Sequence, residues 1–318
     1  MAPPPNIDGV LIQWGDRLFY PGDRIVKTQP QQRLSGLAAR QRAAAIRERI
    51  ESTVVRRAPQ VMVKVTGGGR GMKAIAAHLR YISKNGRLEI EDERGQTTRG
   101  KEALRELADD WRYGGSLIDD TSPRREAFNI MLSMPRGTDP LTVRWAAREF
   151  AKAELADHKL VMVLHDHQAN PHVHISVRAE SKHGKRLNPR KTDLHRWRET
   201  FAAKLRERGI DAEATRQATR GATRNHPQLW QVKAAEQGRL LRPQPRHRRG
   251  TAVATSRAEA QRTWQGIGAA LAGSGDPNDR KLAAAIDRFS REMAWSGQRE
   301  PSAPTPSRQP APEADRSR

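Results

Sequence analysis

The chain contains no cysteine, and this absence excludes several kinds of site at once. Disulfides, thiolate metal ligands and thiol nucleophiles cannot occur. A metal bound through side chains must therefore use histidine and carboxylate ligands. The lack of disulfides is also compatible with a reducing compartment.

Aromatic residues, long apolar runs and nucleotide-binding motifs are scarce or missing as well. Aromatics make up only 5% of the chain, so base stacking cannot be the main way of binding nucleic acid, and we expect Trp197 and Trp230 to serve packing. No run approaches the roughly 18 apolar residues of a membrane helix, and the start, MAPPPNIDGV, lacks a signal-peptide core. We expect no membrane insertion. Without a Walker sequence, we also expect no unwinding of DNA with ATP.

Positive charge is what the chain has in excess. It holds 58 Lys and Arg against 36 Asp and Glu, a formal net charge of +22, and its pI is about 11.2. A field of that sign attracts polyanions, and nucleic acid is the expected one because apolar membrane segments are missing. Its 318 residues leave room for one ordinary core with appendages.

Shifts in composition divide the chain into three parts. Residues 1–57 are a basic N-terminal extension containing the Ala/Arg-rich helical pattern LAARQRAAAIRERI, which is too polar to form a core alone. Residues 58–225 alternate between strand and helix patterns, and residues 226–318 are a basic C-terminal region. This last part contains the cluster RPQPRHRR, a helical segment between Arg280 and Trp295, and a tail from Gln298 that we expect to be disordered.

The middle part predicts an α+β fold with a central, mainly antiparallel sheet flanked by helices. The patterns indicate strands over 60–66 and 126–135 and a helix over 72–83. They also indicate a helix from Asp139, capped ahead of Pro140, to Leu155, and a helix over 192–208.

Three histidines are predicted to meet at one hairpin. KLVMVLH ends a buried strand at His165, AlaAsnPro at 169–171 signals a turn, and HVHISV begins the next strand. Alternate residues of a strand share a face, so His172 and His174 point the same way. An antiparallel hairpin brings His165 beside them, and three neutral imidazoles can bind one divalent metal with positions left for substrate.

Tyr81 is the candidate nucleophile. In the helix over 72–83, Ile75, Leu79 and Ile82 form the core-facing stripe, and Tyr81 lies about 120° from it, on the face of His78. Two interpretations remain open: a hydroxyl that projects into a cleft, or an ordinary amphipathic tyrosine at the surface.

Several basic segments are candidate contacts to the DNA backbone. The loop GGGRG at 67–71 is either a phosphate cradle or a flexible turn. The run 182–191 is strongly basic, and Arg216, Arg220 and Arg224, spaced at i, i+4 and i+8, are predicted to share one helical face. Such runs are often just solvated, but in this chain we favour DNA contact. The expected contacts are Arg70, Lys84, Lys185, Arg186, Arg190, Lys191, Arg216 and Arg220.

Four segments, at 78–95, 129–140, 165–180 and 184–221, follow one another in the order of known motifs. Over about residues 58–225 the chain resembles conjugative relaxases of the HUH endonuclease superfamily, in the mobilisation-type, border-endonuclease-like branch. The resemblance implies that Tyr81 attacks DNA and forms a phosphotyrosyl bond to the 5′ side of the nicked strand. It also implies that His165, His172 and His174 are the metal triad.

One position departs from the family pattern, which has His-x-Asp where this chain has His165, Asp166, His167. Asp166, the candidate acidic catalytic residue, either orients a ligand imidazole, assists deprotonation of Tyr81, or does neither. His167 is a fourth ligand, a phosphate contact or part of an exposed loop.

The expected function is therefore a metal-dependent, site- and strand-specific nicking and religation of single-stranded origin-of-transfer DNA. The expected ion is divalent; abundance favours Mg²⁺ or Mn²⁺, and affinity favours later transition metals. The resemblance implies accessory relaxosome proteins and a secretion-system coupling protein as partners, and a bacterial cytoplasmic location with transfer alongside the DNA. The alternatives are a rolling-circle initiator or transposase, and a non-catalytic DNA-binding protein with a structural metal.

Overall fold

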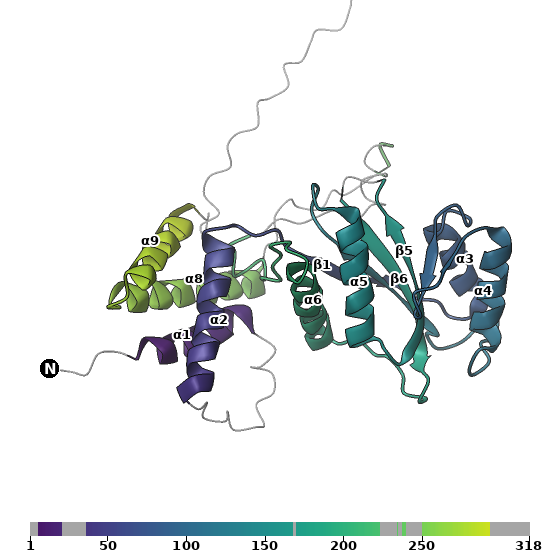
Figure 1. Ribbon diagram of the computed structural model, residues 1–318, viewed down its shortest axis with the longest axis horizontal. Coiled ribbons are helices and arrows are strands. Elements are labelled where there is room, and N and C mark those ends of the chain that lie inside the picture. The colour runs from purple at the N-terminus through teal and green to yellow at the C-terminus, as the bar shows by residue number, and fades with distance from the viewer. Residues whose placement is uncertain are drawn as a thin grey trace, which may run out of the picture.

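An antiparallel sheet of six strands lies at the centre of the fold (Figure 1). The computed structural model describes residues 6–20, 36–167, 170–222, 234, 237–239 and 250–292. The strands, in spatial order, are β1 (Met62–Gly67), β4 (Ala127–Ser133), β6 (His172–Ser181), β5 (His158–His165), β2 (Ile90–Asp92) and β3 (Thr97–Thr98). The predicted α+β architecture with an antiparallel sheet is confirmed.

Helices cover both faces of the sheet, because its central strands are apolar on both sides. On one face α5 (Pro140–Glu154) and α6 (Lys191–Arg206) pack on a core that includes Ile175 and Phe201. On the other face α3 (Met72–Ile82) and α4 (Lys101–Tyr113) pack on a core that includes Leu79, Trp111 and Val163. The two helical layers are visible on either side of the strands in Figure 1.

The predicted start of α5 is confirmed. The Asp139 carboxylate accepts a hydrogen bond from the Thr142 backbone N–H at 2.8 Å, and Pro140 occupies the first turn, where its missing N–H costs nothing. Trp197 is 1% exposed and packs edge-on against Phe150, as expected for a packing residue. Trp230, the RPQPRHRR cluster and the tail from Gln298 lie outside the described residues.

The N-terminal and C-terminal segments pack together into a second body. Helices α1 (Ile7–Phe19), α2 (Gly36–Val54), α8 (Thr251–Ala272) and α9 (Pro277–Glu292) share one apolar core, in which Phe19 and Phe289 stand edge-on to Trp264. We call these four helices the bundle. The polar α2 shares this core with α1 and with helices from the other end of the chain. Helix α9 matches the helix expected between Arg280 and Trp295.

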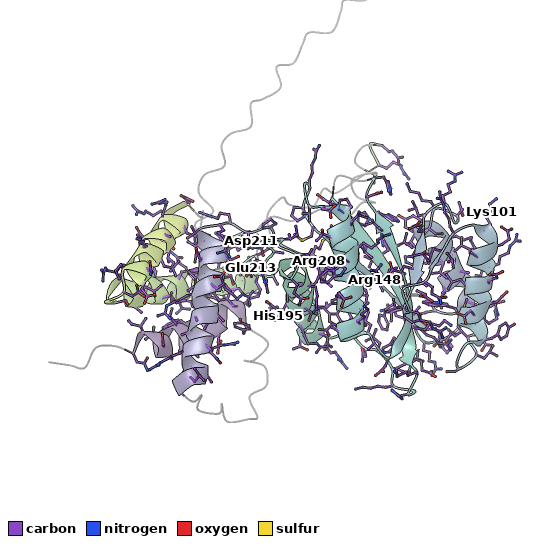
Figure 2. The ribbon with its side chains drawn as sticks, in the orientation of Figure 1. Lys101, Arg148, His195, Arg208, Asp211 and Glu213 are labelled. Atoms are coloured by element: carbon purple, nitrogen blue, oxygen red, sulfur yellow. The ribbon has the colours of Figure 1, made fainter. Side chains whose placement is uncertain are left out.

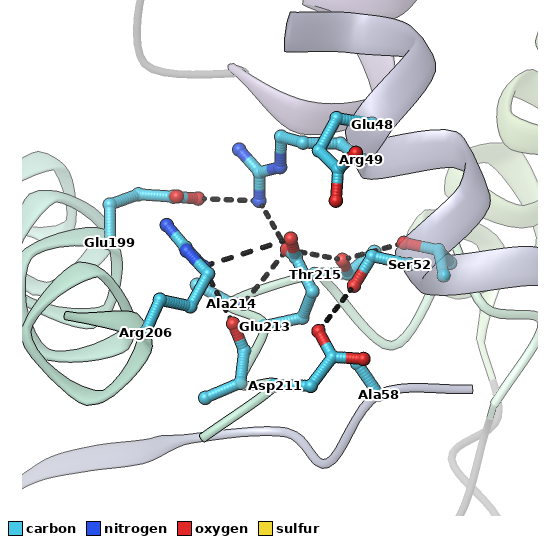
Figure 3. Close-up of polar contacts among 12 residues, drawn as sticks. Glu48, Arg49, Ser52, Ala58, Glu199, Arg206, Asp211, Glu213, Ala214 and Thr215 are labelled. Atoms are coloured by element: carbon cyan, nitrogen blue, oxygen red, sulfur yellow. Dashed lines mark hydrogen bonds and ion pairs between the residues drawn. The ribbon is translucent and has the colours of Figure 1, made fainter. Parts of the chain in front are cut away.

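The bundle is joined to the sheet body by a buried ion-pair network (Figure 3). Arg49 of α2 is 7% exposed, and its guanidinium donates to Glu213 at 2.9 Å and to Glu199 of α6 at 3.0 Å. Beside it the Thr53 and Thr215 hydroxyls lie 3.2 Å apart. Among the described residues, no helix is long and apolar enough to cross a membrane.

Candidate active site

The hairpin of β5 and β6 brings the three predicted histidines together. His165 pairs directly with His172, and Val163 pairs with His174, so the three side chains share one face of the sheet. Their ring centroids form a near-equilateral triangle with sides of 4.7, 5.0 and 5.1 Å. Each ring offers one nitrogen, and the three nitrogens lie within 4.8 Å of one another.

Backbone carbonyls orient two of these rings. His165 Nε2 lies 2.7 Å from the Ile82 carbonyl, and His172 Nδ1 lies 2.9 Å from the Asn170 carbonyl. A carbonyl can only accept, so each of these nitrogens carries the proton. The lone pair is therefore on His165 Nδ1 and on His172 Nε2, which is the arrangement that metal-ligating histidines adopt.

Burial keeps the triad neutral at physiological pH. Burial, reinforced by the neighbouring His165 and His172, lowers the pKa of His174 to about 3. Burial also lowers the pKa values of His165 and His172. Within the described residues, the buried Nδ1 of His174 has no hydrogen-bond partner. Three neutral imidazoles with free lone pairs fit a divalent metal ion.

Tyr81 lies near the triad, and its side chain is exposed to solvent. It occupies the last turn of α3 with its side chain 66% exposed, off the buried stripe, as its helical phase predicts. Its ring centroid is 6.3 Å from that of His78, which in turn is 6.4 Å from that of His174. The next residue, Ile82, supplies the carbonyl that holds His165. The end of α3 and the histidine hairpin thus form one site.

His78 also belongs to this site. Its sequence position predicted that it shares a helical face with Tyr81, but not that it lies next to the triad. Burial lowers its pKa to about 4, so its ring is neutral, and within the described residues its buried Nε2 has no hydrogen-bond partner. The signal was its position three residues before Tyr81, which puts both on one helical face.

Asp166 and His167, whose order departs from the family pattern, lie outside the group of three histidines that could hold a metal ion. Asp166 is exposed, lines a hollow with Leu164 and Val173 on the α5 side of the sheet, and makes no side-chain hydrogen bond or ion pair in the described structure. Of the three interpretations of Asp166, the structure disfavours the orientation of an imidazole, because the carbonyls of Ile82 and Asn170 orient His165 and His172. His167 is also exposed, with its ring centroid 5.2 Å from that of His165.

The predicted basic segments do not all gather near the triad. Lys84 does, since its charge contributes to lowering the pKa of His165, after the larger effect of burial. The run 182–191, which contains Lys185, Arg190 and Lys191, follows Ser181 at the far end of β6. At a rise of about 3.3 Å per residue, that end of the strand lies about 30 Å from His172. Arg186 is engaged in ion pairs with two glutamates there.

The glycine loop at 67–71 is a close-packed turn at the opposite end of α3 from Tyr81. A Cβ at Gly68 would stand 2.3 Å from the Ala127 carbonyl oxygen, and the first amides of α3, at Met72 and Lys73, already donate to carbonyls of residues 119 and 120. Arg70 donates to the Pro123 carbonyl at 3.0 Å. This geometry favours the turn over the phosphate cradle.

The predicted helical alignment of three arginines is wrong where the structure describes them. Residues 217–221 form a turn, and Arg224 lies outside the described residues. Arg216 donates to the Arg17 carbonyl at 2.9 Å, and Arg220 donates to the Thr215 carbonyl at 3.2 Å. The two guanidinium groups therefore bind separate backbone carbonyls instead of lining one helical face, and Arg216 ties this turn to the end of α1.

Comparison with known proteins identifies the sheet body. Residues 81–210 match the family model described as relaxase, MobA/VirD2-like, nuclease domain. Residues 81–210 form a relaxase domain. The chain is 25% identical over 186 residues to the T-DNA border endonuclease VirD2 of Agrobacterium fabrum, a match over 52% of this chain and 41% of that protein. It is 26% identical over 182 residues to the VirD2 of Rhizobium radiobacter, covering 51% of this chain and 43% of that protein.

The chain thus spans about two fifths of the length of these curated relatives. The match to the relaxase model begins at Tyr81 and includes all three triad histidines. The bundle lies outside it.

Proposed function

We propose that this protein nicks and religates one strand of single-stranded or melted origin-of-transfer DNA through a covalent bond to Tyr81. The observation that carries the proposal is the exposed tyrosine next to three neutral, convergent histidines within a relaxase domain. A DNA strand approaching the exposed Tyr81 ring meets the histidine cluster on the same side of the sheet.

The chemistry is a transesterification. The Tyr81 hydroxyl oxygen bonds to the phosphorus, and the bond from phosphorus to the 3′ oxygen of the leaving strand breaks. That oxygen keeps the electron pair and takes up a proton, while the phenol proton passes to solvent. One phosphodiester is exchanged for another, so no nucleotide cofactor is required and the reverse step rejoins the strand.

His165, His172 and His174 would hold a divalent ion, which supplies positive charge to the non-bridging phosphate oxygens. Mg²⁺ or Mn²⁺ is the proposed ion in use. The histidines keep their lone pairs available through two carbonyl hydrogen bonds and low pKa values. Accessory relaxosome proteins that melt the DNA, and a coupling protein that delivers the conjugate to a secretion channel, are the proposed partners.

The test uses single-stranded oligonucleotides that tile the DNA flanking the encoding gene, incubated with the full chain and Mg²⁺ or Mn²⁺. We expect a protein–DNA adduct that survives denaturant, disappears in Tyr81→Phe and persists in Tyr113→Phe. Tyr113 is a suitable control because it is equally exposed, at 68% against 66%, but lies at the end of α4. Chelation or His172→Ala should abolish the adduct and leave much of the DNA binding.

An adduct that is unchanged in Tyr81→Phe refutes the assignment of the nucleophile. DNA binding by the parent chain without any adduct on the full set of oligonucleotides would instead favour a non-catalytic DNA-binding protein.

A further inference from the structure

A groove of about 720 Å³ runs between α3 and α4, on the flank of α3 opposite His78. Its size is in the range of sites that hold organic ligands. Its apolar lining comes from Ala76, Leu104 and Ala108, and its basic lining includes Arg80, Arg87 and Lys101. Lys101, at the start of α4, stands on the side of the molecule remote from the bundle (Figure 2).

The three basic side chains are not used by the fold. In the described part of the chain, Arg80, Arg87 and Lys101 are exposed and make no side-chain hydrogen bond or ion pair. Other cations nearby are engaged: Arg105 pairs with Glu102 at 3.7 Å, and Arg112 pairs with Asp120 at 2.5 Å. Three uncompensated cations around an apolar floor are complementary to a ligand with anionic groups on an apolar body.

The charge is arranged along the groove. Arg80 precedes Tyr81 in the chain, so the basic part of the groove begins at the end of α3 that carries the nucleophile. A smaller hollow of about 210 Å³ shares Ala76, Arg80 and Ala108 with the groove, and its remaining charged lining is mixed: Lys73, Arg112, Asp109 and Asp120. The described lining of the groove contains no carboxylate, so positive charge is least compensated in the groove itself and is partly offset toward the start of α3.

We propose that this groove binds the single-stranded DNA that flanks the phosphate at Tyr81. Phosphates of the strand would pair with Arg80, Arg87 and Lys101, and an unstacked base would rest on Ala76 and Leu104. A duplex cannot offer its bases in this way, so the groove selects single-stranded DNA. None of the described residues that line it is aromatic, so the contact tolerates different base sequences. The inference rests on the proposed nicking function for its placement at the cleaved strand.

The test measures binding of fluorescent dT oligomers of about 20 nucleotides to the full chain carrying Tyr81→Phe, so that cleavage plays no part. The groove variant adds Arg80→Gln, Arg87→Gln and Lys101→Gln. The matched control instead adds Arg40→Gln, Arg288→Gln and Lys281→Gln, which remove the same charges from exposed positions on the bundle. All six are solvent-exposed, so both variants should fold, and thermal unfolding verifies this.

We expect the groove variant to bind the oligomer about tenfold or more weakly. The slope of log K against log salt concentration should become shallower by about 2, since each of three lost single-strand phosphate contacts contributes about 0.7. The bundle control should lose less than about threefold, because charges far from the strand are screened. Cross-links from 5-iododeoxyuridine in the oligomer should map to peptides within residues 72–113 in the parent and be lost in the groove variant.

Equal losses in the two variants overturn the proposal, because only the overall charge would then matter. Cross-links confined to other segments also overturn it. A second arm compares nicking of flank-truncated oligonucleotides with Tyr81 intact: the groove variant should raise KM without lowering kcat, and only while the flank on one side of the nick is present. If no oligonucleotide is nicked but the binding difference stands, the nicking function fails and the groove survives.

Discussion

Replacing Arg49 tests whether the bundle and the relaxase domain are held together by the buried network of Figure 3. Burial opposes the charge of Arg49, but Glu199 and Glu213 outweigh it and raise the pKa of the guanidinium above its ordinary value. Arg49→Ala leaves Glu213, which is 3% exposed, without its nearest cation. Breaking a buried pair in this way typically costs about 3 to 5 kcal/mol.

The expected cost is at the lower end of that range, because Arg206 remains 3.8 Å from Glu213 and supplies part of the missing charge. Urea unfolding of the full chain measures it, and Arg291→Ala is the control. Arg291 pairs with Asp287 across one turn of α9, both more than half exposed, so its removal should cost no more than about 0.5 kcal/mol.

A double variant separates the ion pair from general damage to the helix. Arg49→Met combined with Glu213→Gln removes both charges and preserves volume, and it should be more stable than Arg49→Met alone. A loss below about 1 kcal/mol in Arg49→Ala, or no recovery in the double variant, refutes the reasoning that this pair joins the two bodies.

Three further predictions concern the bundle and the site. Hydrogen bonds from Arg47 hold the pKa of Asp279 below its ordinary value. The stability that Asp279 provides is therefore present above about pH 4 and is lost as the pH falls through its lower folded pKa. The difference in thermal midpoint between the parent and Asp279→Asn should shrink with acidification, and a constant difference argues against this reasoning. A Cβ at Gly15 would stand 2.6 Å from Ile46, so Gly15→Ala should cost about 1 to 3 kcal/mol in urea unfolding, whereas an unchanged midpoint would show that α1 and α2 can separate freely. Asp166→Asn should leave the rate of adduct formation within about threefold, since the side chain faces away from the triad, and a hundredfold loss would restore its catalytic role.

The local features of the sheet body were predictable because they depend on short-range rules. The alternation of His172 and His174, the turn signal before them and the AspPro start of α5 each depend on residues a few positions apart. The same holds for the phase of Tyr81 on its helix. Once these two neighbouring strands are assumed to form a hairpin, their spacing brings the three histidines together. The proximity of the three side chains was therefore predictable from the sequence.

Features that depend on distant parts of the chain were not predictable. The bundle core joins α1 to α8 and α9 across most of the sequence, and α2 alone is too polar to show that it has a partner. Helix α4 was missed, although it supplies Trp111 to the core and one wall of the groove. The arginine spacing at 216–220 gave a wrong prediction because the Arg216 guanidinium binds the Arg17 carbonyl, far away in the chain, and the Arg220 guanidinium binds the Thr215 carbonyl.

One contact links the two chemical halves of the site and lies beyond any sequence pattern. The Ile82 carbonyl, one residue past Tyr81, accepts the Nε2 proton of His165, which is 83 positions away in the chain. A carbonyl at the end of a helix lacks an intrahelical partner, so this bond also satisfies a group that would otherwise be buried and unpaired. The bond fixes the tautomer of the ring and the position of the helix end together. A shift of α3 that moved Tyr81 away from the triad would break the bond that orients the His165 ring, so Tyr81 and the triad are positioned as one unit.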